Sequence, residues 1–327
     1  MRLFSRPGVL ALAVLLAPLA ACGEGEIDVA TAERVPLDLD KRDAERLARY
    51  YLGGLAAVEG ADPVEAGLLE VDGSDLYVNP QRLRPEVRAA LVAADTGSPG
   101  RIDWDEFTAF VEATYATARA LPPTIDGLRA AHGDWHDDAT WFGYDVEGSA
   151  MTRARRHLRV PVAALREAIA AAAAGSGPVY PAGTLIVGEH LGADGAVLET
   201  TIKRRRADGF WDFAVYGPDG RLAEATATPP RPLRAPVQCA GCHLGQRQFE
   251  PERSFPAPSP DGPAGPRAVV VPDAWRDADA TARFREHAAR TDGVLGLYAT
   301  LYVARLRADR AAGLALAPED VLLLRGE

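Results

Sequence analysis

The pentapeptide Cys239-Ala240-Gly241-Cys242-His243 constrains this chain more than any other feature of its sequence. It matches the C-x-x-C-H pattern to which c-type haem is attached, because two thiols can add to the haem vinyl groups while the adjacent imidazole binds the iron. Four prolines between residues 229 and 236 precede the motif and predict a loop that enters a short helix. The pattern therefore predicts one covalent haem c held by Cys239, Cys242 and His243.

Three other uses of a C-x-x-C pair compete with haem: half of a zinc site, a dithiol redox centre and a structural disulfide. A zinc site needs two more good ligands, which would have to come from scattered histidines or acids. A thioredoxin-like pair would sit between a strand and a helix of a βαβ unit. The third cysteine of the chain, Cys22, lies near the other end and leaves no second C-x-x-C pair. Haem is therefore the interpretation that we favour.

The N-terminal segment has the parts of a bacterial export signal. Arg2 and Arg6 precede an apolar stretch over residues 9–21, and Leu19-Ala20-Ala21-Cys22 resembles a lipobox, in which the cysteine carries the lipid. An ordinary signal peptide with an incidental cysteine is the alternative. The apolar stretch is short for a membrane-spanning helix, so we expect acyl chains on Cys22 to anchor the protein. The expected location is the cell envelope, facing the periplasm or the exterior, where bacterial cytochromes c mature.

Composition narrows the classes of partner. The chain has 46 acidic and 36 basic residues, for a formal net charge of −10. This balance gives no support to nucleic-acid binding. The expected partners are the membrane, through the lipid anchor, and either a small gas or a redox protein. Lysine is scarce, and Lys41 and Lys203 are the only two.

Apolar spacing and turn residues predict an α+β fold in which a small antiparallel-sheet c-type cytochrome domain is flanked by N- and C-terminal helical segments. The expected segments are a signal peptide (1–21), a tether (22–42), a helical segment with an EF-hand-like loop (43–125), a haem domain (126–265) and a C-terminal helical segment (266–327). We expect helices over residues 43–58, 85–94, 104–121, 161–174 and 274–312, and strands over 184–187, 197–203 and 211–216. The C-terminal helices are candidates to pack on the EF-hand-like segment.

The loop between the second and third expected helices resembles an EF-hand calcium loop. Asp95, Gly100, Asp103 and Glu106 stand at loop positions 1, 6, 9 and 12. Positions 3 and 5, which usually carry oxygen ligands, are glycine and proline. Because only Asp95, Asp103 and Glu106 offer side-chain oxygens, calcium would bind weakly at most. We favour a degenerate hand that serves as a helix-loop-helix packing unit.

From residue 181 onward the order of motifs resembles the cytochrome P-460 family and the related beta class of cytochrome c′. The motifs are Pro181-Ala-Gly-Thr-Leu-Ile-Val-Gly-Glu-His190, then Ile202-Lys203, then Trp211-Asp-Phe213 with a Gly-Pro-Asp-Gly turn, then the C-x-x-C-H motif. The resemblance covers residues 130–260. It implies a sheet-rich domain with a five-coordinate haem that His243 holds on one side, and a pocket of sheet residues on the other. Members of the family oxidise hydroxylamine or bind nitric oxide.

The resemblance also implies a difference from the enzymes of that family, which carry a lysine on the first strand that crosslinks to the haem. That position aligns with Gly188. Lys203 lies on the next strand beside three arginines, and we expect it at a solvent-facing strand end. Without the crosslink, hydroxylamine oxidation loses its main support, and gas binding or electron transfer gains.

Strand alternation places His190 on the same face as position 188. A neutral imidazole there could be a sixth haem ligand or a hydrogen-bond donor to a bound ligand. The alternative, slightly favoured, is a strand-end histidine that points to solvent. Further pocket or packing candidates are Glu189, Arg204, Phe213, Phe249 and Phe255. Residues 132–138 are dense in histidine and aspartate but match no metal signature, and we expect a loop there.

Three functions stay open at this point. The first is a cytochrome for electron transfer or gas binding, and it is the one we favour. The second is an oxidoreductase that acts on hydroxylamine or related small nitrogen compounds. The third is a lipoprotein without haem whose helices form an interaction module. The sequence leaves open whether the protein is an enzyme.

Overall fold

The structure, a computed structural model, describes residues 27–41, 43–58, 62–97, 100–148, 155–175, 179–227, 230–243, 267–276 and 293–325. The expected signal peptide, Cys22, Phe249 and Phe255 lie outside these residues. The described part has the α+β fold that the sequence predicts. Among its helices, none is long and apolar enough to cross a membrane.

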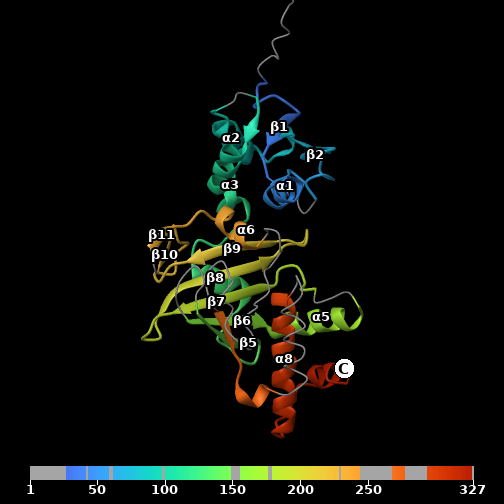
Figure 1. The fold of residues 1–327 in the computed structure, drawn as a ribbon, viewed down its shortest axis with the longest axis vertical. Helices are drawn as coiled ribbons and strands as arrows, with labels where there is room; N and C mark the ends of the chain where they lie inside the picture. The colour runs from blue at the N-terminus through green and yellow to red at the C-terminus, as the bar shows by residue number, and fades with distance from the viewer. Residues whose placement is uncertain are drawn as a thin grey trace, which may run out of the picture.

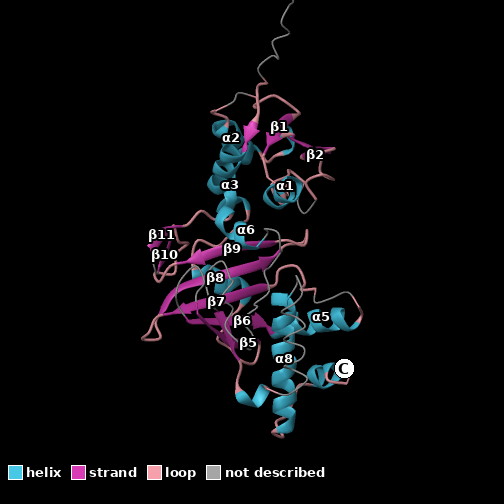
Figure 2. Cartoon of the chain, viewed as in Figure 1, coloured by secondary structure: helices cyan, strands magenta, loops and turns pink. Residues whose placement is uncertain are grey.

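The N-terminal section combines helices with a small sheet that the sequence analysis missed (Figures 1 and 2). The strands lie in the order β2-β3-β1-β4; β1 and β4 run parallel and the other pairs antiparallel. The expected tether is wrong over β1, because Val35, Leu37 and Leu39 alternate into the core. The elements are β1 (Val35–Asp38), α1 (Ala44–Leu52), β2 (Leu69–Asp72), β3 (Asp75–Val78), η1 (Pro80–Arg82), α2 (Pro85–Ala94), β4 (Ile102–Asp103) and α3 (Trp104–Ala118).

The centre of the molecule is a six-stranded antiparallel sheet in the order β12-β5-β6-β7-β8-β9. The prediction of β7, β8 and β9 is confirmed, as is that of α5, whereas β5, β6 and β12 were missed. The elements are α4 (Ile125–His132), β5 (Trp141–Gly148), β6 (Arg155–Pro161), α5 (Val162–Ala173), β7 (Leu185–Leu191), β8 (Val197–Arg205), β9 (Trp211–Tyr216) and β12 (Arg267–Val270). Figure 2 shows this sheet between the N-terminal section and the C-terminal helices.

Alternation along the strands gives the sheet two faces with separate cores. The Cys239 face carries Tyr144, Arg156, Leu158, Ile186, Gly188, His190, Glu199, Thr201, Lys203 and Phe213, and its apolar members belong to the core that contains Cys239. The Trp135 face carries Asp145, His157, Val187, Glu189, Ile202, Asp212, Ala214 and Tyr216, and its apolar members pack with Trp135. The strands β5, β7 and β9 therefore contribute apolar side chains to both cores, whereas β6 contributes to the Cys239 core and β8 to the Trp135 core.

A buried ion network joins the N-terminal section to the sheet. Arg119 Nη2 donates to the carbonyl oxygens of Tyr50 and Tyr51, both at 3.1 Å, and so satisfies the end of α1. Arg119 Nε lies 3.3 Å from Asp212 Oδ1 on β9, and the two side chains are 5% and 2% exposed. The two parts of the chain therefore share one polar junction as well as an apolar core.

The C-terminal helices α8 (Gly293–Ala311) and α9 (Pro318–Leu323) pack against α5 and the sheet. The Tyr302 ring lies 5.4 Å from that of Phe142 on β5, and Arg166 of α5 pairs with Asp320 at 2.7 Å. Figure 1 places these helices at the opposite end of the molecule from α2 and α3. The expectation that they pack on the EF-hand-like segment is therefore wrong. Of the expected helix over 274–312, residues 277–292 lie outside the described part.

Candidate functional site

The C-x-x-C-H motif ends a short helix, α6 (Val237–His243), which follows the paired strands β10 (Ala225–Ala227) and β11 (Pro230–Pro232). The predicted short helix is confirmed, but Pro230–Pro232 before it form β11 where a loop was expected. Its first turn is tied to the chain before it, since Gln238 N–H donates to Arg234 O and Ala240 N–H to Pro236 O, both at 2.8 Å. Helix positions three and four apart are neighbours on one face. The helix thus brings the positions of Cys239, Cys242 and His243 together.

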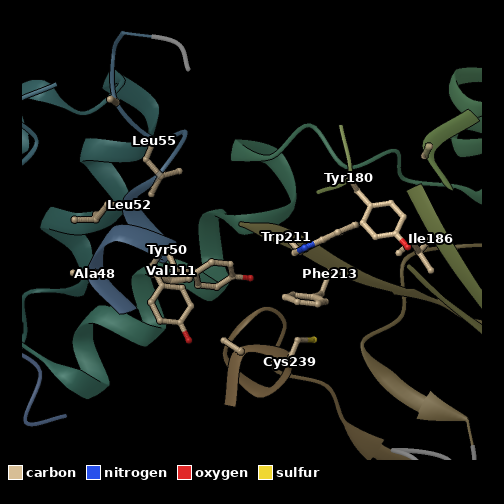
Figure 3. Close-up of a cluster of buried hydrophobic side chains, with 14 of the residues drawn as sticks. Ala48, Tyr50, Leu52, Leu55, Val111, Tyr180, Ile186, Trp211, Phe213 and Cys239 are labelled. Carbon is tan, nitrogen blue, oxygen red and sulfur yellow. The ribbon is translucent and has the colours of Figure 1, made fainter. Parts of the chain in front are cut away.

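Cys239 is buried, with 5% of its surface exposed. Figure 3 shows it beside Phe213 of β9, with Tyr50 and Val111 of the N-terminal section on the other side. Figure 1 shows α6 between α3 and β9. The first cysteine of the motif is therefore seated at the edge of the Cys239 face of the sheet.

Gly188, which the expected resemblance places at the position of a crosslinking lysine, lies in the middle of this face. A Cβ atom added there would lie 2.8 Å from Thr201 Oγ1 and 3.0 Å from Leu158 Cδ2. A longer side chain at this position would displace both neighbours. Lys203 lies on the same face, between Ile186 and Phe213 in the sheet register, and is half-buried. The expectation that Lys203 lies at a solvent-facing strand end is therefore wrong.

His190 is buried on the Cys239 face with 3% of its surface exposed, so a solvent-facing histidine is wrong and the predicted strand parity is correct. Its Nδ1 lies 3.2 Å from Glu199 Oε1, and its Nε2 lies 3.4 Å from Thr201 Oγ1. Burial, and then the positive charge of Arg156, lower the pKa of His190 to about 3. The imidazole is therefore neutral at physiological pH, and the carboxylate beside Nδ1 favours the proton on that nitrogen.

Arg156 stands opposite His190 in the sheet. Its Nε and Nη2 atoms are buried and have no hydrogen-bond partner in the described part of the chain. Glu199, two strands away, does not meet them: its Oε2 accepts from Ala227 N–H at 2.8 Å, and its Oε1 is also buried without a hydrogen-bond partner. A buried donor without a partner costs about 1–3 kcal/mol. Such a group calls for an explanation, and an unseen anion is one.

The Trp135 face holds its polar groups differently. Glu189 Oε1 accepts from Trp135 Nε1 at 3.0 Å and lies 2.9 Å from His136 Nε2. Arg204 pairs with Asp212 at 3.1 Å. Glu189 and Arg204, which the sequence offered as candidates for the pocket, therefore lie on the opposite side of the sheet from Cys239. Phe213 is the one described member of that set on the Cys239 face.

The expected loop over residues 132–138 is confirmed from Gly133 onward, although its Trp135 is fully buried. His136 stays partly exposed, as a solvated loop requires. The strand that follows, β5, belongs to the sheet whose Trp135 face packs against this loop.

The EF-hand-like segment forms the expected helix-loop-helix of α2 and α3, and its turn glycine, Gly100, has a φ of +81°. Glu106 Oε1 accepts from the backbone N–H groups of Thr96 at 2.8 Å and Gly97 at 2.6 Å, and Oε2 from Asp103 N–H at 3.0 Å. Asp103 in turn caps α3. Both oxygens of Glu106 thus hold the loop together. The described residues contain no group of three or more His, Cys, Asp or Glu side chains placed to hold a metal ion.

Two features of the Cys239 face fit a haem. Leu158, Ile186 and Phe213 are apolar side chains on this face, although Thr201 and Lys203 of β8 lie among them, and the unpaired N–H groups of Arg156 could take an anion such as a propionate. The sequence analysis missed Arg156, Glu199 and Thr201. The sequence signal for these residues was their alternation with other side chains along a strand. Because the pairing of the strands was unknown, that signal did not link them to His190.

None of the known protein-family models matches this chain, and no curated protein or solved structure matches it either.

Proposed function

We propose that this chain is a c-type cytochrome that binds one haem covalently through Cys239 and Cys242, with His243 as an axial ligand, and that acts in electron transfer or in binding a small gas such as nitric oxide. The observation that carries the proposal is the C-x-x-C-H motif on a single short helix that seats Cys239 against a sheet face. A bound haem supplies an iron that changes oxidation state and takes diatomic ligands. The other groups of the proposed site are side chains of the protein.

The sheet residues have separate roles in this proposal. Phe213 and Leu158 would pack against the macrocycle and keep water from it. His190, whose Nδ1 lies 3.2 Å from Glu199 Oε1, is the polar residue that we propose near the cofactor. Thr201 and Leu158 fill the space beside Gly188 that a side chain there would occupy, which favours a haem without a lysine crosslink at that position.

Oxidation of hydroxylamine is the second candidate, and one observation favours it. Lys203, the single lysine of the expected haem domain, is half-buried on the Cys239 face. A crosslink from this neighbouring strand would restore the feature that Gly188 lacks. A third candidate, an interaction module without haem, needs no cofactor at all.

Ligand spectra of the purified protein separate these functions. We expect nitric oxide to change the Soret band of the ferrous protein, and hydroxylamine to reduce no added acceptor. Turnover of hydroxylamine in the wild type but not in Lys203→Gln would establish the enzyme instead. The same chain with no haem absorption would leave the interaction module.

We also propose that the protein is exported and lipid-anchored through Cys22, with its folded part in the periplasm or outside the cell. Support comes from the three-part N-terminal signal and from the C-x-x-C-H motif, since bacterial cytochromes c mature outside the cytoplasmic membrane. Cys22→Ala should abolish labelling by a fatty-acid probe and release the protein from the membrane fraction. Calcium is left out of the proposal, because Glu106 is engaged by backbone N–H groups.

A further inference from the structure

Two nitrogen atoms of the Arg156 guanidinium, Nε and Nη2, are buried without a hydrogen-bond partner in the described part of the chain. These two N–H groups form one edge of the planar fork, the edge that matches the two oxygens of a carboxylate. They make no hydrogen bond to Glu199, the nearby acid on this face: its Oε2 accepts from Ala227 N–H, and its Oε1, 3.2 Å from His190 Nδ1, is also buried without a hydrogen-bond partner.

The position of Arg156 on the sheet narrows the anion. Cys239 packs beside β9, and Arg156 stands on β6, three strands away in the same sheet and on the same face. Three strand spacings are about 14 Å. The vinyl and propionate groups of haem leave opposite edges of the macrocycle. A haem tied to α6 by its vinyl groups and laid over β8 and β7 therefore turns its carboxylates toward β6.

We infer that Arg156 binds a haem propionate through Nε and Nη2, and this rests on the proposed function because it takes the haem from there. The guanidinium then gains the partner that the protein alone does not provide. It also offsets the negative charge of the propionate near the iron and so favours the ferrous state. Arg156 is a cofactor-binding residue in this account.

The test compares Arg156→Gln with Arg155→Gln in the full-length, haem-loaded protein. Arg155 is the adjacent residue on β6, points to the other face, is largely exposed and pairs with Asp145. Both variants lose one positive charge. We expect Arg156→Gln to shift the propionate bending mode in the resonance Raman spectrum and to lower the midpoint reduction potential, whereas Arg155→Gln keeps both at their wild-type values.

Arg156→Lys guards against a variant that fails to fold. It keeps the charge but lacks the fork, so it should shift the propionate mode and leave the potential close to that of the wild type. The assignment is overturned if the propionate mode and potential of the Arg156 variants match those of the Arg155 control. Added nitrite supplies a second check. The assignment is also overturned if Arg156→Gln keeps the wild-type propionate mode and potential but loses a spectral change that nitrite causes in the wild type, because Arg156 would then bind a free oxyanion. A wild type without covalent haem would overturn the proposed function as well, and its spectrum, recorded first, tells the two failures apart.

Discussion

Alternate residues of the same strands meet two different environments on the two faces of the central sheet. On the Trp135 face, buried charges find partners within the chain: Glu189 with Trp135 and His136, and Asp212 with Arg119 and Arg204. On the Cys239 face, Arg156 keeps two buried N–H groups without a described partner. These charges of the Trp135 face therefore have partners within the chain, whereas the Arg156 guanidinium has none among the described residues.

This difference separates buried polar groups that stabilise the fold from those that could bind a ligand. A buried charge that is fully paired is explained by the fold, whereas an unpaired one in a native structure asks for a ligand. The contrast is one of degree, since His157 Nε2, Arg159 Nε and Asp212 Oδ1 on the Trp135 face are also buried without a hydrogen-bond partner. Each of these side chains, however, keeps a charged partner through another contact: Asp145 lies 2.6 Å from His157 Nδ1, Asp138 lies 2.5 Å from Arg159 Nη1, and Arg204 lies 3.1 Å from Asp212 Oδ2. Each prediction below tests one side of the contrast.

The largest effect is expected at the buried junction. Asp212→Ala removes the counter-charge of Arg119, and the pair is almost inaccessible to solvent. Loss of one partner of a buried ion pair costs about 3–5 kcal/mol. Urea unfolding measures this. Asp138→Ala is the control, because Asp138 pairs with Arg159 from an 81% exposed position and should cost at most about 0.5 kcal/mol. Equal effects would show that burial does not set the strength of these pairs.

Trp135→Phe tests the hydrogen bond to the buried Glu189. The change keeps most of the packing but removes the Nε1 donor that lies 3.0 Å from Glu189 Oε1. We expect a loss of about 1–3 kcal/mol in the free energy of unfolding, because the carboxylate loses a buried donor. Trp141→Phe, in the same core, makes the same change without that bond. A smaller loss for Trp135→Phe than for Trp141→Phe contradicts the assignment.

The pH dependence of stability reports on His190. Burial, and then Arg156, lower its pKa from 6.5 to about 3, so the unfolded chain binds a proton between these values that the folded protein excludes. The unfolding free energy should therefore fall as pH drops from 6.5 toward 3, with a slope that approaches about 1.4 kcal/mol per pH unit. His190→Gln should flatten this part of the profile, while any contribution from His132, whose pKa is also lowered, stays in both proteins. Identical profiles would mean that His190 is not buried.

The smallest effect concerns the glycine at the centre of the Cys239 face. Gly188→Ala brings a methyl group within 2.8 Å of Thr201 Oγ1 and 3.0 Å of Leu158 Cδ2. Overpacking of this kind should cost about 1 kcal/mol, since both contacts are with side chains that can shift. Gly143→Ala is the matched change on the Trp135 face, where the methyl group would lie 2.8 Å from His157 Nε2. A stabilised Gly188→Ala would reveal an empty space over Gly188.

The sequence predicted what local patterns encode. The helices α2 and α3, the strands β7 to β9 and the helix of the C-x-x-C-H motif follow from apolar spacing, turn residues and proline placement. The sheet in the N-terminal section was missed because Val35, Leu37 and Leu39 alternate over too few residues to stand out from a polar segment. The strands β5 and β6 were missed because arginine, histidine and aspartate interrupt their apolar pattern.

The candidate site shows the same limit. Alternation placed His190 on the correct face, but it gave no partner for the ring, and so solvent was favoured over burial. Glu199 and Arg156 meet His190 through strand pairing, which a single sequence does not specify without the register. For the same reason Lys203 was assigned to solvent, although it lies on the Cys239 face, and Glu189 was assigned to the pocket, although it lies on the Trp135 face.

The most direct test of the account is a pyridine haemochrome spectrum of the denatured protein, expressed with its own signal in a bacterium that has the cytochrome c maturation machinery. The account predicts the ordinary spectrum of a haem bound by two thioethers, and its loss when Cys239 and Cys242 are both changed to Ala. A distorted spectrum with covalent haem would indicate an additional crosslink and favour the hydroxylamine enzyme. Haem that is absent, or that is extracted from the denatured wild type, would contradict the central claim.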